Sequence, residues 1–236
     1  MVSQLLLGEV FEVREKKQTW LRIHTHCDDY EGWVDEKQVQ EIKQSLFSEL
    51  TSSSLFCSLE LFTIAESDKR KIILFTGSSL PKYDTQSFKI NNELFQFDSA
   101  VTGGLEQNTI EQVPSFATRF LNIPYLWGGR SPAGVDCSGF TNIIYKLAGI
   151  RLHRDAWQQS EQGILVSFID EARPGDLAFF QNEEGKIIHV GIILPHQKII
   201  HASGRVRIDT IDHYGIYNEE LKKYTHPLRL IRRIIH

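Results

Sequence analysis

The 236-residue sequence predicts an α+β fold in which two small β units precede a larger unit of helices and antiparallel strands. Short alternating strand patterns fill the first half of the chain. A Thr-Gly-Gly linker stretch over 102–108 then separates them from two helical patterns and a series of strand patterns, which is an α+β layout. We place the units at residues 1–50, 51–106 and 107–236.

The first unit contains three short strand patterns. Polar and apolar residues alternate over 9–14 and 20–24, and a third pattern over 31–35 is entered through a glycine. Short strands separated by polar turns are typical of a small half-open barrel. We expect Trp20 and Trp33 to pack in its core.

The second unit follows a polar connector over 38–54. Strand patterns resume over 58–62 and 71–75 and continue, after a turn, over 87–90 and 94–97. This unit is about as large as the first, although no residue-level repeat relates the two. The pattern predicts a second small β domain.

The third unit places a cysteine at the start of a helix. Apolar residues recur at helical spacing over 110–121 and again over 140–147, and Cys137 lies just ahead of the second stripe. A helix N-terminus exposes N–H groups and partial positive charge, which lower a thiol pKa and offer donors to an oxyanion. Cys137 is therefore a candidate nucleophile. The alternative is a buried cysteine that acts as a small hydrophobic residue.

Two histidines follow on neighbouring strand patterns. His189 and His201 lie on either side of a turn around Pro195. A hairpin at that turn places the two imidazoles side by side on one face. One can then activate the thiol while the second orients the first. The alternative is a pair of core histidines with ordinary hydrogen-bond partners.

Composition narrows the classes of function. Twenty-six Lys and Arg residues against 30 Asp and Glu residues give a formal net charge of −4, without the basic surface of a general nucleic-acid or membrane binder. The three cysteines are far apart and form no CxxC pair, which argues against structural zinc and a disulfide framework. No signal peptide or membrane span is recognisable, so we expect a cytoplasmic protein.

Several segments of the third unit carry a family resemblance. They are Tyr125-Leu-Trp-Gly-Gly-Arg130, Asp136-Cys-Ser-Gly-Phe140, Arg173-Pro-Gly-Asp-Leu177, His189-Val-Gly-Ile192 and His201-Ala-Ser-Gly204. Over about residues 107–215 the chain resembles the NlpC/P60 family of cell-wall cysteine peptidases. The resemblance implies a papain-like fold with Cys137 as nucleophile, His189 as base and His201 as the orienting residue. It further implies that Tyr125 lies near the oxyanion and that the reaction uses no metal or other cofactor.

The first half resembles bacterial SH3-like domains at residues 7–9 and 30–34. With two SH3-like domains before the catalytic domain, the chain resembles the γ-D-glutamyl-L-diamino acid endopeptidases, which cleave murein peptides after L-Ala-γ-D-Glu and require a free amino-terminal alanine. The resemblance implies an amine-binding site formed by Asp136, Ser138, Glu9 and Tyr30. The alternatives are helix capping by Asp136 and Ser138, a solvated strand-edge charge at Glu9, and core packing of Tyr30.

The leading hypothesis is a cysteine peptidase that hydrolyses the amide between γ-D-Glu and a diamino acid in murein peptides with a free L-Ala, in cell-wall peptide recycling. We expect a small murein peptide as its partner, and neither nucleic acid nor a membrane. A general wall endopeptidase, or an amidase or acyltransferase of the same fold, is an alternative because fold does not fix function. A wall-binding module with a degenerate catalytic half is disfavoured by Cys137, His189 and His201.

Overall fold

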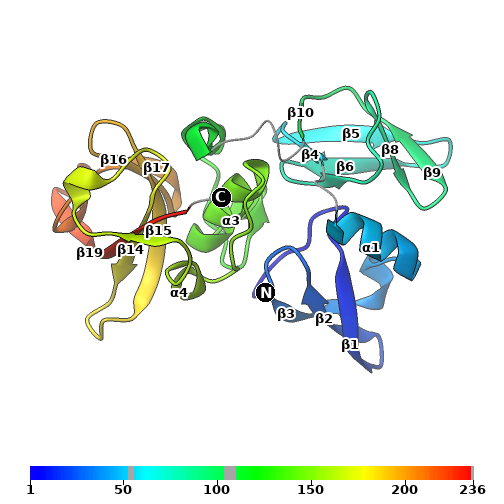
Figure 1. The fold of residues 1–236 in the computed structure, drawn as a ribbon, viewed down its shortest axis with the longest axis horizontal. Helices are drawn as coiled ribbons and strands as arrows, with labels where there is room; N and C mark the ends of the chain where they lie inside the picture. Colours follow the sequence, from blue (N-terminus) through cyan, green and yellow to red (C-terminus); the bar gives the residue numbers. More distant parts are fainter. Residues whose placement is uncertain (53–55, 104–109, 235–236) are drawn as a thin grey trace.

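The computed structural model describes residues 1–52, 56–103 and 110–234, which form three β-rich units (Figure 1). The predicted boundary at 106–107 and most of the predicted linker over 102–108 lie outside the described residues. The boundary predicted between residues 50 and 51 falls inside a helix, α1 (Gln44–Ser52).

The first unit is a three-stranded antiparallel sheet with β2 at its centre. Its elements are β1 (Phe11–Lys17), β2 (Trp20–Thr25), β3 (Glu31–Asp35), the 3-10 helix η1 (Glu36–Gln38) and α1. Ile23 of β2 points inward and is buried. Trp20 and Trp33 are 49% and 44% exposed, so the prediction that they pack in the core is wrong. Trp33 pairs with Arg22 on the solvent face of the sheet, because period-2 alternation sends it away from Ile23.

The second unit combines a three-stranded and a four-stranded sheet, in the orders β10-β4-β7 and β6-β5-β9-β8. Its strands are β4 (Phe56–Ser58), β5 (Phe62–Glu66), β6 (Lys71–Phe75), β7 (Ser79–Leu80), β8 (Ser87–Ile90), β9 (Glu93–Gln96) and β10 (Val101–Thr102). Phe88 and Phe95 stack at 5.3 Å between ring centroids in its core. The small β unit is confirmed, and its SH3-like character stays a prediction.

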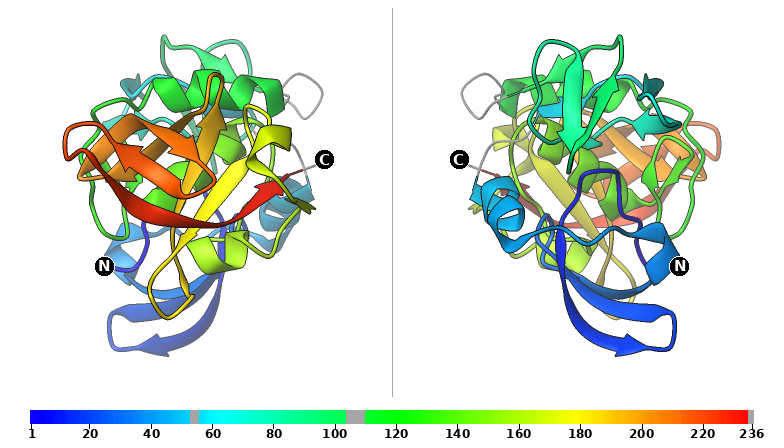
Figure 2. Two further views of the ribbon diagram at one scale, coloured as in Figure 1. Left: turned by 90° about the vertical axis from the view of Figure 1, so that its left-hand side faces the viewer. Right: turned by 90° about the vertical axis from the view of Figure 1, so that its right-hand side faces the viewer.

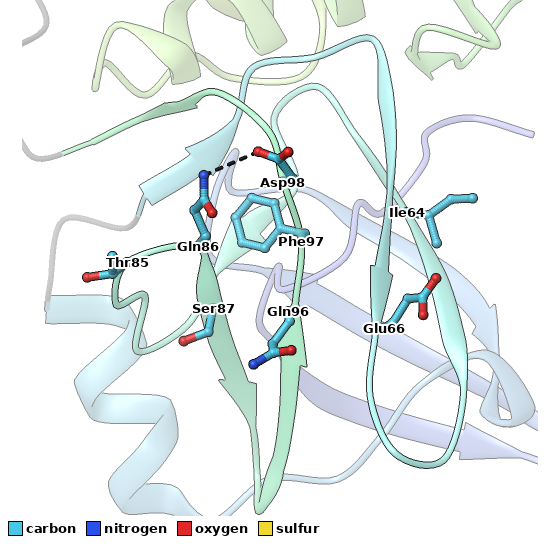
Figure 3. Close-up of a pocket in the computed structure, with 8 residues that line it drawn as sticks. All are labelled: Ile64, Glu66, Thr85, Gln86, Ser87, Gln96, Phe97 and Asp98. Carbon is cyan, nitrogen blue, oxygen red and sulfur yellow. Dashed lines mark hydrogen bonds between the residues drawn. The ribbon is translucent and has the colours of Figure 1, made fainter.

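A groove crosses the four-stranded sheet of the second unit (Figure 3). It is lined by Ile64, Glu66, Thr85, Gln86, Ser87, Gln96, Phe97 and Asp98. Nε2 of Gln86 donates to Oδ1 of Asp98 at 3.2 Å across one end. None of the predicted catalytic or substrate-binding residues is among those that line it.

The third unit begins with helices that lie against a sheet. Its first elements are η2 (Ile110–Gln112), α2 (Val113–Thr118), β11 (Arg130–Ser131), β12 (Gly134–Val135), α3 (Cys137–Leu147) and α4 (Ala156–Gln159). Helix α3 is buried along almost its whole length and ends just before Gly149, whose positive φ of 77° suits a glycine after a helix. Among the described residues, no helix has the length and apolar character needed to cross a membrane.

A closed barrel completes the third unit (Figures 1 and 2). The remaining elements are β13 (Ile164–Val166), η3 (Ile169–Glu171), β14 (Leu177–Gln181), β15 (Ile187–Leu194), β16 (Lys198–Ser203), β17 (Arg205–Asp212), β18 (Gly215–Asn218) and β19 (Lys223–Arg233). Strand β19 pairs with both β14 and β18, which closes the six strands β14–β19 into a ring. Phe180 and Ile193 belong to the inner core, whereas Phe179 and Ile192 belong to the core shared with α3. The predicted α+β arrangement is confirmed.

Candidate active site

Cys137 is the first residue of α3, as the apolar stripe predicted. Asp136 is the N-cap, and its Oδ1 accepts a hydrogen bond from the Gly139 backbone N–H at 2.7 Å. A Cβ at Gly139 would lie 2.1 Å from the carbonyl oxygen of Gly129, so only glycine permits this close approach of the helix to the preceding loop. The local sequence therefore fixes where the helix, and with it the thiol, begins.

The Cys137 thiol is protonated at rest, contrary to the prediction of a lowered pKa. Burial and the neighbouring Asp136 carboxylate raise the pKa of Cys137 to about 11, against the opposing effect of backbone N–H groups of Val190 and Ser138. The helix N-terminus is a weaker influence because the thiol is only 8% exposed and the cap is itself an anion. A thiol in this state must lose its proton before it can act as the predicted nucleophile.

The two predicted histidines meet on the hairpin that the sequence indicated. Strands β15 and β16 pair antiparallel around a turn at 195–197, and His201 lies opposite Gly191, two residues from His189. Nε2 of His189 lies 2.8 Å from Nδ1 of His201. The backbone N–H of Val190, the residue after His189, contacts the Cys137 sulfur. The structure thus brings the thiol to the strand that carries the proposed base.

Asp209 extends this arrangement on β17. Its Oδ2 lies 3.0 Å from Nε2 of His201, and the Arg207 guanidinium binds both carboxylate oxygens at 2.7 and 2.9 Å. Although burial alone raises the pKa of Asp209, His201 and Arg207 lower it, so the carboxylate is ionised. An ionised carboxylate only accepts hydrogen bonds, so the His201 Nε2 carries a proton.

The tautomer of His189 follows from the same chain of bonds. Burial lowers the pKa of His201, so its imidazole is neutral and its Nδ1 is an acceptor. The Nε2 of His189 must then carry the proton that joins the two rings, which leaves the lone pair of His189 on Nδ1. Burial also lowers the pKa of His189 well below its usual value, so the ring is a neutral imidazole with a free lone pair.

Tyr125 lies beside the nucleophile, as the resemblance implied. Its backbone bridges to Val135, one residue before the helix cap. Burial, Cys137 and Asp136 together raise the pKa of Tyr125 to about 12, which keeps the phenol protonated and able to donate a hydrogen bond. The phenol and the N–H groups at the start of α3 form the donor set available to an oxyanion.

Arg154 binds both predicted residues that flank the cysteine. Its Nη1 and Nη2 donate to the two oxygens of Asp136 at 3.0 and 2.7 Å, and Nη1 also donates to Oγ of Ser138 at 2.9 Å. The Arg154 side chain is 1% exposed, and Oγ of Ser3 accepts from its Nε at 3.0 Å. Asp136 thus caps the helix and forms a buried ion pair at the same time.

Glu9 lies in a separate buried ion cluster between the first and third units. Its oxygens accept from Nη1 and Nη2 of Arg130, both at 3.0 Å, and from Nζ of Lys146 at 2.8 Å. Burial raises the pKa of Glu9, but these two cations outweigh it and lower the pKa to about 2. Side-chain exposures of 1% for Glu9 and Arg130 show that the carboxylate is neither a strand-edge charge nor open to solvent.

Tyr30 reaches the third unit beside another carboxylate. It follows a loop in which Oγ1 of Thr25 accepts from the Tyr30 backbone N–H at 3.0 Å. Burial, followed by the charge of Asp155 in the third unit, raises the pKa of Tyr30. Burial likewise raises the pKa of Asp155, next to Arg154 and Asp136. Among the described residues, no salt bridge includes Asp155, whereas both Asp136 and Glu9 are paired.

Sequence reasoning missed four residues of this site: Arg154, Asp155, Asp209 and His226. The first two follow α3 in the loop before α4, and the contact of Arg154 with Ser138 depends on how that loop folds back. Asp209 lies on β17, which pairs antiparallel with β16. Its approach to His201 could therefore have been predicted by pairing the strand pattern after His201 with the strand that carries His201. Within the described part of the chain, no group of three or more His, Cys, Asp or Glu side chains is arranged to hold a metal ion.

Comparison with known proteins places these features in a family. Residues 122–226 match the NlpC/P60 family, and residues 1–39 match the bacterial dipeptidyl-peptidase Sh3 domain. A γ-D-glutamyl-L-lysine dipeptidyl-peptidase of Bacillus subtilis is 30% identical over 215 residues, covering 85% of this chain and 71% of that protein. The chain belongs to the NlpC/P60 family. A Bacillus cereus protein of the same name is also 30% identical, over 85% of this chain and 66% of its own length.

Solved NlpC/P60 structures agree with the architecture. A crystal structure of an NlpC/P60 family protein from Bacillus cereus superposes with a TM-score of 0.81 at 25% identity, covering 98% of this chain and 81% of that chain. An NlpC/P60 endopeptidase from Photobacterium damselae subsp. piscicida shares the fold with a TM-score of 0.68 at 18% identity, over 97% and 62% of the two chains. The predicted NlpC/P60 membership, its cysteine-hydrolase class and the first SH3-like domain are confirmed. The division at 1–50, 51–106 and 107–236 and the roles of individual site residues stay predictions.

Proposed function

We propose that this chain is a cysteine peptidase that hydrolyses the amide between γ-D-Glu and a diamino acid in peptides with a free amino-terminal L-Ala. The observation that supports the proposal most strongly is that a histidine–aspartate chain and two carboxylates both lie near the start of α3. Cys137 contacts the backbone N–H of Val190, the residue after His189 in the His189–His201–Asp209 chain, and it lies next to Asp136, whose charge also acts on Asp155. The names of the two Bacillus relatives support the same substrate class.

The proposed reaction is acyl transfer through a thioester. Nδ1 of His189 takes the thiol proton while the Cys137 sulfur attacks the side-chain carbonyl carbon of γ-D-Glu. The Tyr125 hydroxyl and the N–H groups at the start of α3 stabilise the resulting oxyanion. The imidazolium returns its proton to the nitrogen of the departing diamino acid. A water molecule, deprotonated by the same imidazole, then attacks the thioester carbon. The C–S bond breaks, L-Ala-γ-D-Glu is released, and the imidazolium returns its proton to the Cys137 sulfur.

Asp155 is the carboxylate best placed to receive the substrate ammonium. A buried ammonium requires a counter-charge, and Asp136 already shares its charge with Arg154. Asp155 forms no salt bridge among the described residues, although the charge of Arg154 and a hydrogen bond from Trp157 oppose the rise in its pKa that burial causes. Its own charge acts on the Tyr30 phenol of the first domain. Asp136 and Ser138 stay predicted contacts at the same end of the pocket. The ion pairs of Glu9 favour a role in holding the two domains together over amine binding.

An amine site built from two domains limits the substrate to a free terminus. The half-buried carboxylate of Asp155 would admit an amino-terminal L-Ala and γ-D-Glu and exclude a stem peptide whose alanine is still linked to the glycan. This supports action on released murein peptides rather than intact wall. Peptide recycling and a cytoplasmic location remain predictions.

Product analysis tests the reaction directly. The chain is incubated with L-Ala-γ-D-Glu-meso-diaminopimelate and with the corresponding lysine peptide, and products are identified by mass spectrometry. The proposal predicts L-Ala-γ-D-Glu plus the free diamino acid from at least one peptide, and none with the Cys137→Ala variant. Release of free alanine, or transfer of the dipeptide to an added amine without hydrolysis, would contradict it.

A further inference from the structure

His226 lies against the proposed base, and the mechanism above does not use it. It belongs to β19, the strand that closes the barrel, and pairs there with Ile216. Its ring stacks on the ring of His189 with 4.3 Å between centroids and an interplanar angle of 28°. Among the described residues, the other ring contacts of His189 are not near-parallel: its contact with Phe180 is tilted at 45°, with 5.8 Å between centroids, and its contact with His201 is edge-on at 84°.

The surroundings of His226 hold its ring in place. The ring meets His201 and Phe180 edge-on, with centroid distances of 5.6 and 6.0 Å. Its Nδ1 lies 2.8 Å from Oγ1 of Thr225. The His226 ring is thus fixed by β14 and β16 and by its own strand, and it presents one face to His189.

Stacking supplies a constraint that the hydrogen bond to His201 lacks. A single bond at Nε2 fixes one atom of the His189 ring and leaves the ring free to turn about that contact. A second ring in offset face contact fixes the plane as well. With both the Nε2 contact and the plane fixed, the lone pair on Nδ1 keeps one direction. Burial and the proximity of His201 lower the pKa of His226 to about 4, so the stacked ring is neutral at neutral pH.

We propose that His226 is a positioning residue that fixes the plane of the His189 imidazole by stacking and so aims its Nδ1 at the Cys137 thiol. The proposal rests on the function proposed above, in which His189 is the base. In this proposal, the planar ring of His226 fixes the His189 imidazole, and the nitrogen atoms of His226 are not required.

Two substitutions separate the ring from its polar atoms. His226→Phe keeps a planar ring and removes the nitrogens, whereas His226→Asn keeps a hydrogen-bonding group for Thr225 and removes the ring. His213→Ala is the matched control, because His213 is an exposed imidazole in the turn after β17. Each variant is assayed for kcat and KM on the tripeptide and for the rate of Cys137 alkylation by iodoacetamide at neutral pH.

We expect His226→Asn to lower kcat by about ten-fold or more with KM within about two-fold, because a transition-state interaction is lost while binding is kept. His226→Phe should retain kcat within about three-fold of the wild type, and His213→Ala should match it. The rate of Cys137 alkylation should likewise fall most in His226→Asn, little in His226→Phe and not at all in His213→Ala. A purely structural defect would lower the unfolding temperature and raise KM without this rescue by phenylalanine.

Two results would overturn the proposal. One is a loss of kcat in His226→Phe as large as that in His226→Asn. The other is a wild-type kcat in His226→Asn. If His226→Asn fails to fold, the phenylalanine variant still decides, since a ten-fold loss there contradicts a role for the ring. Failure of the proposed function is distinguishable: the wild type would then leave the tripeptide intact, while the alkylation rates of the variants would still report on His226.

Discussion

Nε2 of His189 and Nδ1 of His201 lie 2.8 Å apart, and the position of the proton between them decides which nitrogen of His189 is the base. Because Asp209 accepts from the other nitrogen of His201, the bridging proton belongs to His189. In the proposed mechanism, Asp209 therefore acts on Cys137 through the two imidazoles, although it lies two strands away from His189.

Asp209→Asn should therefore impair catalysis without weakening binding. An asparagine can accept from or donate to His201, so the tautomer of both rings is no longer fixed. We expect kcat to fall by about ten- to a hundred-fold, less than where a carboxylate contacts the base directly. KM should change little. Steady-state kinetics on the tripeptide check this, and a fall in kcat/KM carried by KM alone would contradict the tautomer argument.

Removal of either reacting partner should abolish turnover. Cys137→Ala removes the nucleophile and His189→Ala removes the base, and members of a coupled pair each cost several orders of magnitude. His201→Ala should lose less, because water can replace part of its hydrogen bonding. Rates are compared with circular dichroism spectra that report the fold. Near-normal activity of Cys137→Ala would rule out the nucleophile assignment.

Alkylation of the free enzyme should follow the raised thiol pKa. With a pKa of about 11 for Cys137, the thiolate fraction keeps rising through neutral and alkaline pH. We therefore expect the rate of inactivation by iodoacetamide to increase up to about pH 11. Peptide mapping should find Cys137 modified before Cys27 and Cys57, whose thiol pKa values burial also raises. A rate already constant from pH 6 would indicate a resting thiolate–imidazolium pair instead.

The Glu9 cluster should contribute strongly to stability. Glu9→Gln removes the carboxylate nearest to the buried Arg130, leaving it the more distant Asp28 at 3.8 Å, and it also removes the salt-bridge partner of Lys146. Breaking a buried pair typically costs about 3–5 kcal/mol in the free energy of unfolding. Glu36→Gln, which breaks the exposed pair with Lys16, is the control and should cost about 0–1 kcal/mol. Urea unfolding at neutral pH measures both. Equal losses in the free energy of unfolding from the two substitutions would show that the Glu9 cluster does not hold the two domains together.

The pH dependence of that cluster has a defined sign. The folded-state pKa of Glu9 is about 2, below its ordinary value of 4.5. Its contribution is therefore fully present above the unfolded value and is lost as the pH falls towards 2. The stability difference between wild type and Glu9→Gln should narrow between about pH 5 and pH 2. A difference that widens on acidification would contradict the assigned charge state.

Local patterns were enough to predict the elements that carry the nucleophile and the histidines. The apolar stripe after Cys137 and the turn at Pro195 predicted α3 and the β15–β16 hairpin, because both depend on short-range periodicity. The thiol pKa was predicted in the wrong direction, since burial depends on how the barrel covers the helix start. Contacts between units, such as Arg130 with Glu9, were beyond sequence reasoning because no pattern records which charges meet.

Trp20 and Trp33 illustrate a second limit. An aromatic residue in a strand fits a core or a solvent face equally well by propensity. Which face is covered depends on the layer that packs against the sheet, and here the buried residue is Ile23. The alternation was predicted correctly, and the choice of inner face was not.

The requirement for a free amino terminus is the central claim, and one ratio tests it most directly. The value of kcat/KM is measured for L-Ala-γ-D-Glu-L-Lys and for the same peptide acetylated on its alanine. Acetylation removes the charge that pairs with the carboxylates beside Tyr30, at about 1.5–3 kcal/mol for a charged hydrogen bond, and adds bulk. The account predicts a loss of about two orders of magnitude or more with the wild type, and a smaller gap with Asp155→Asn. Equal cleavage of the free and acetylated peptides by the wild type would contradict it.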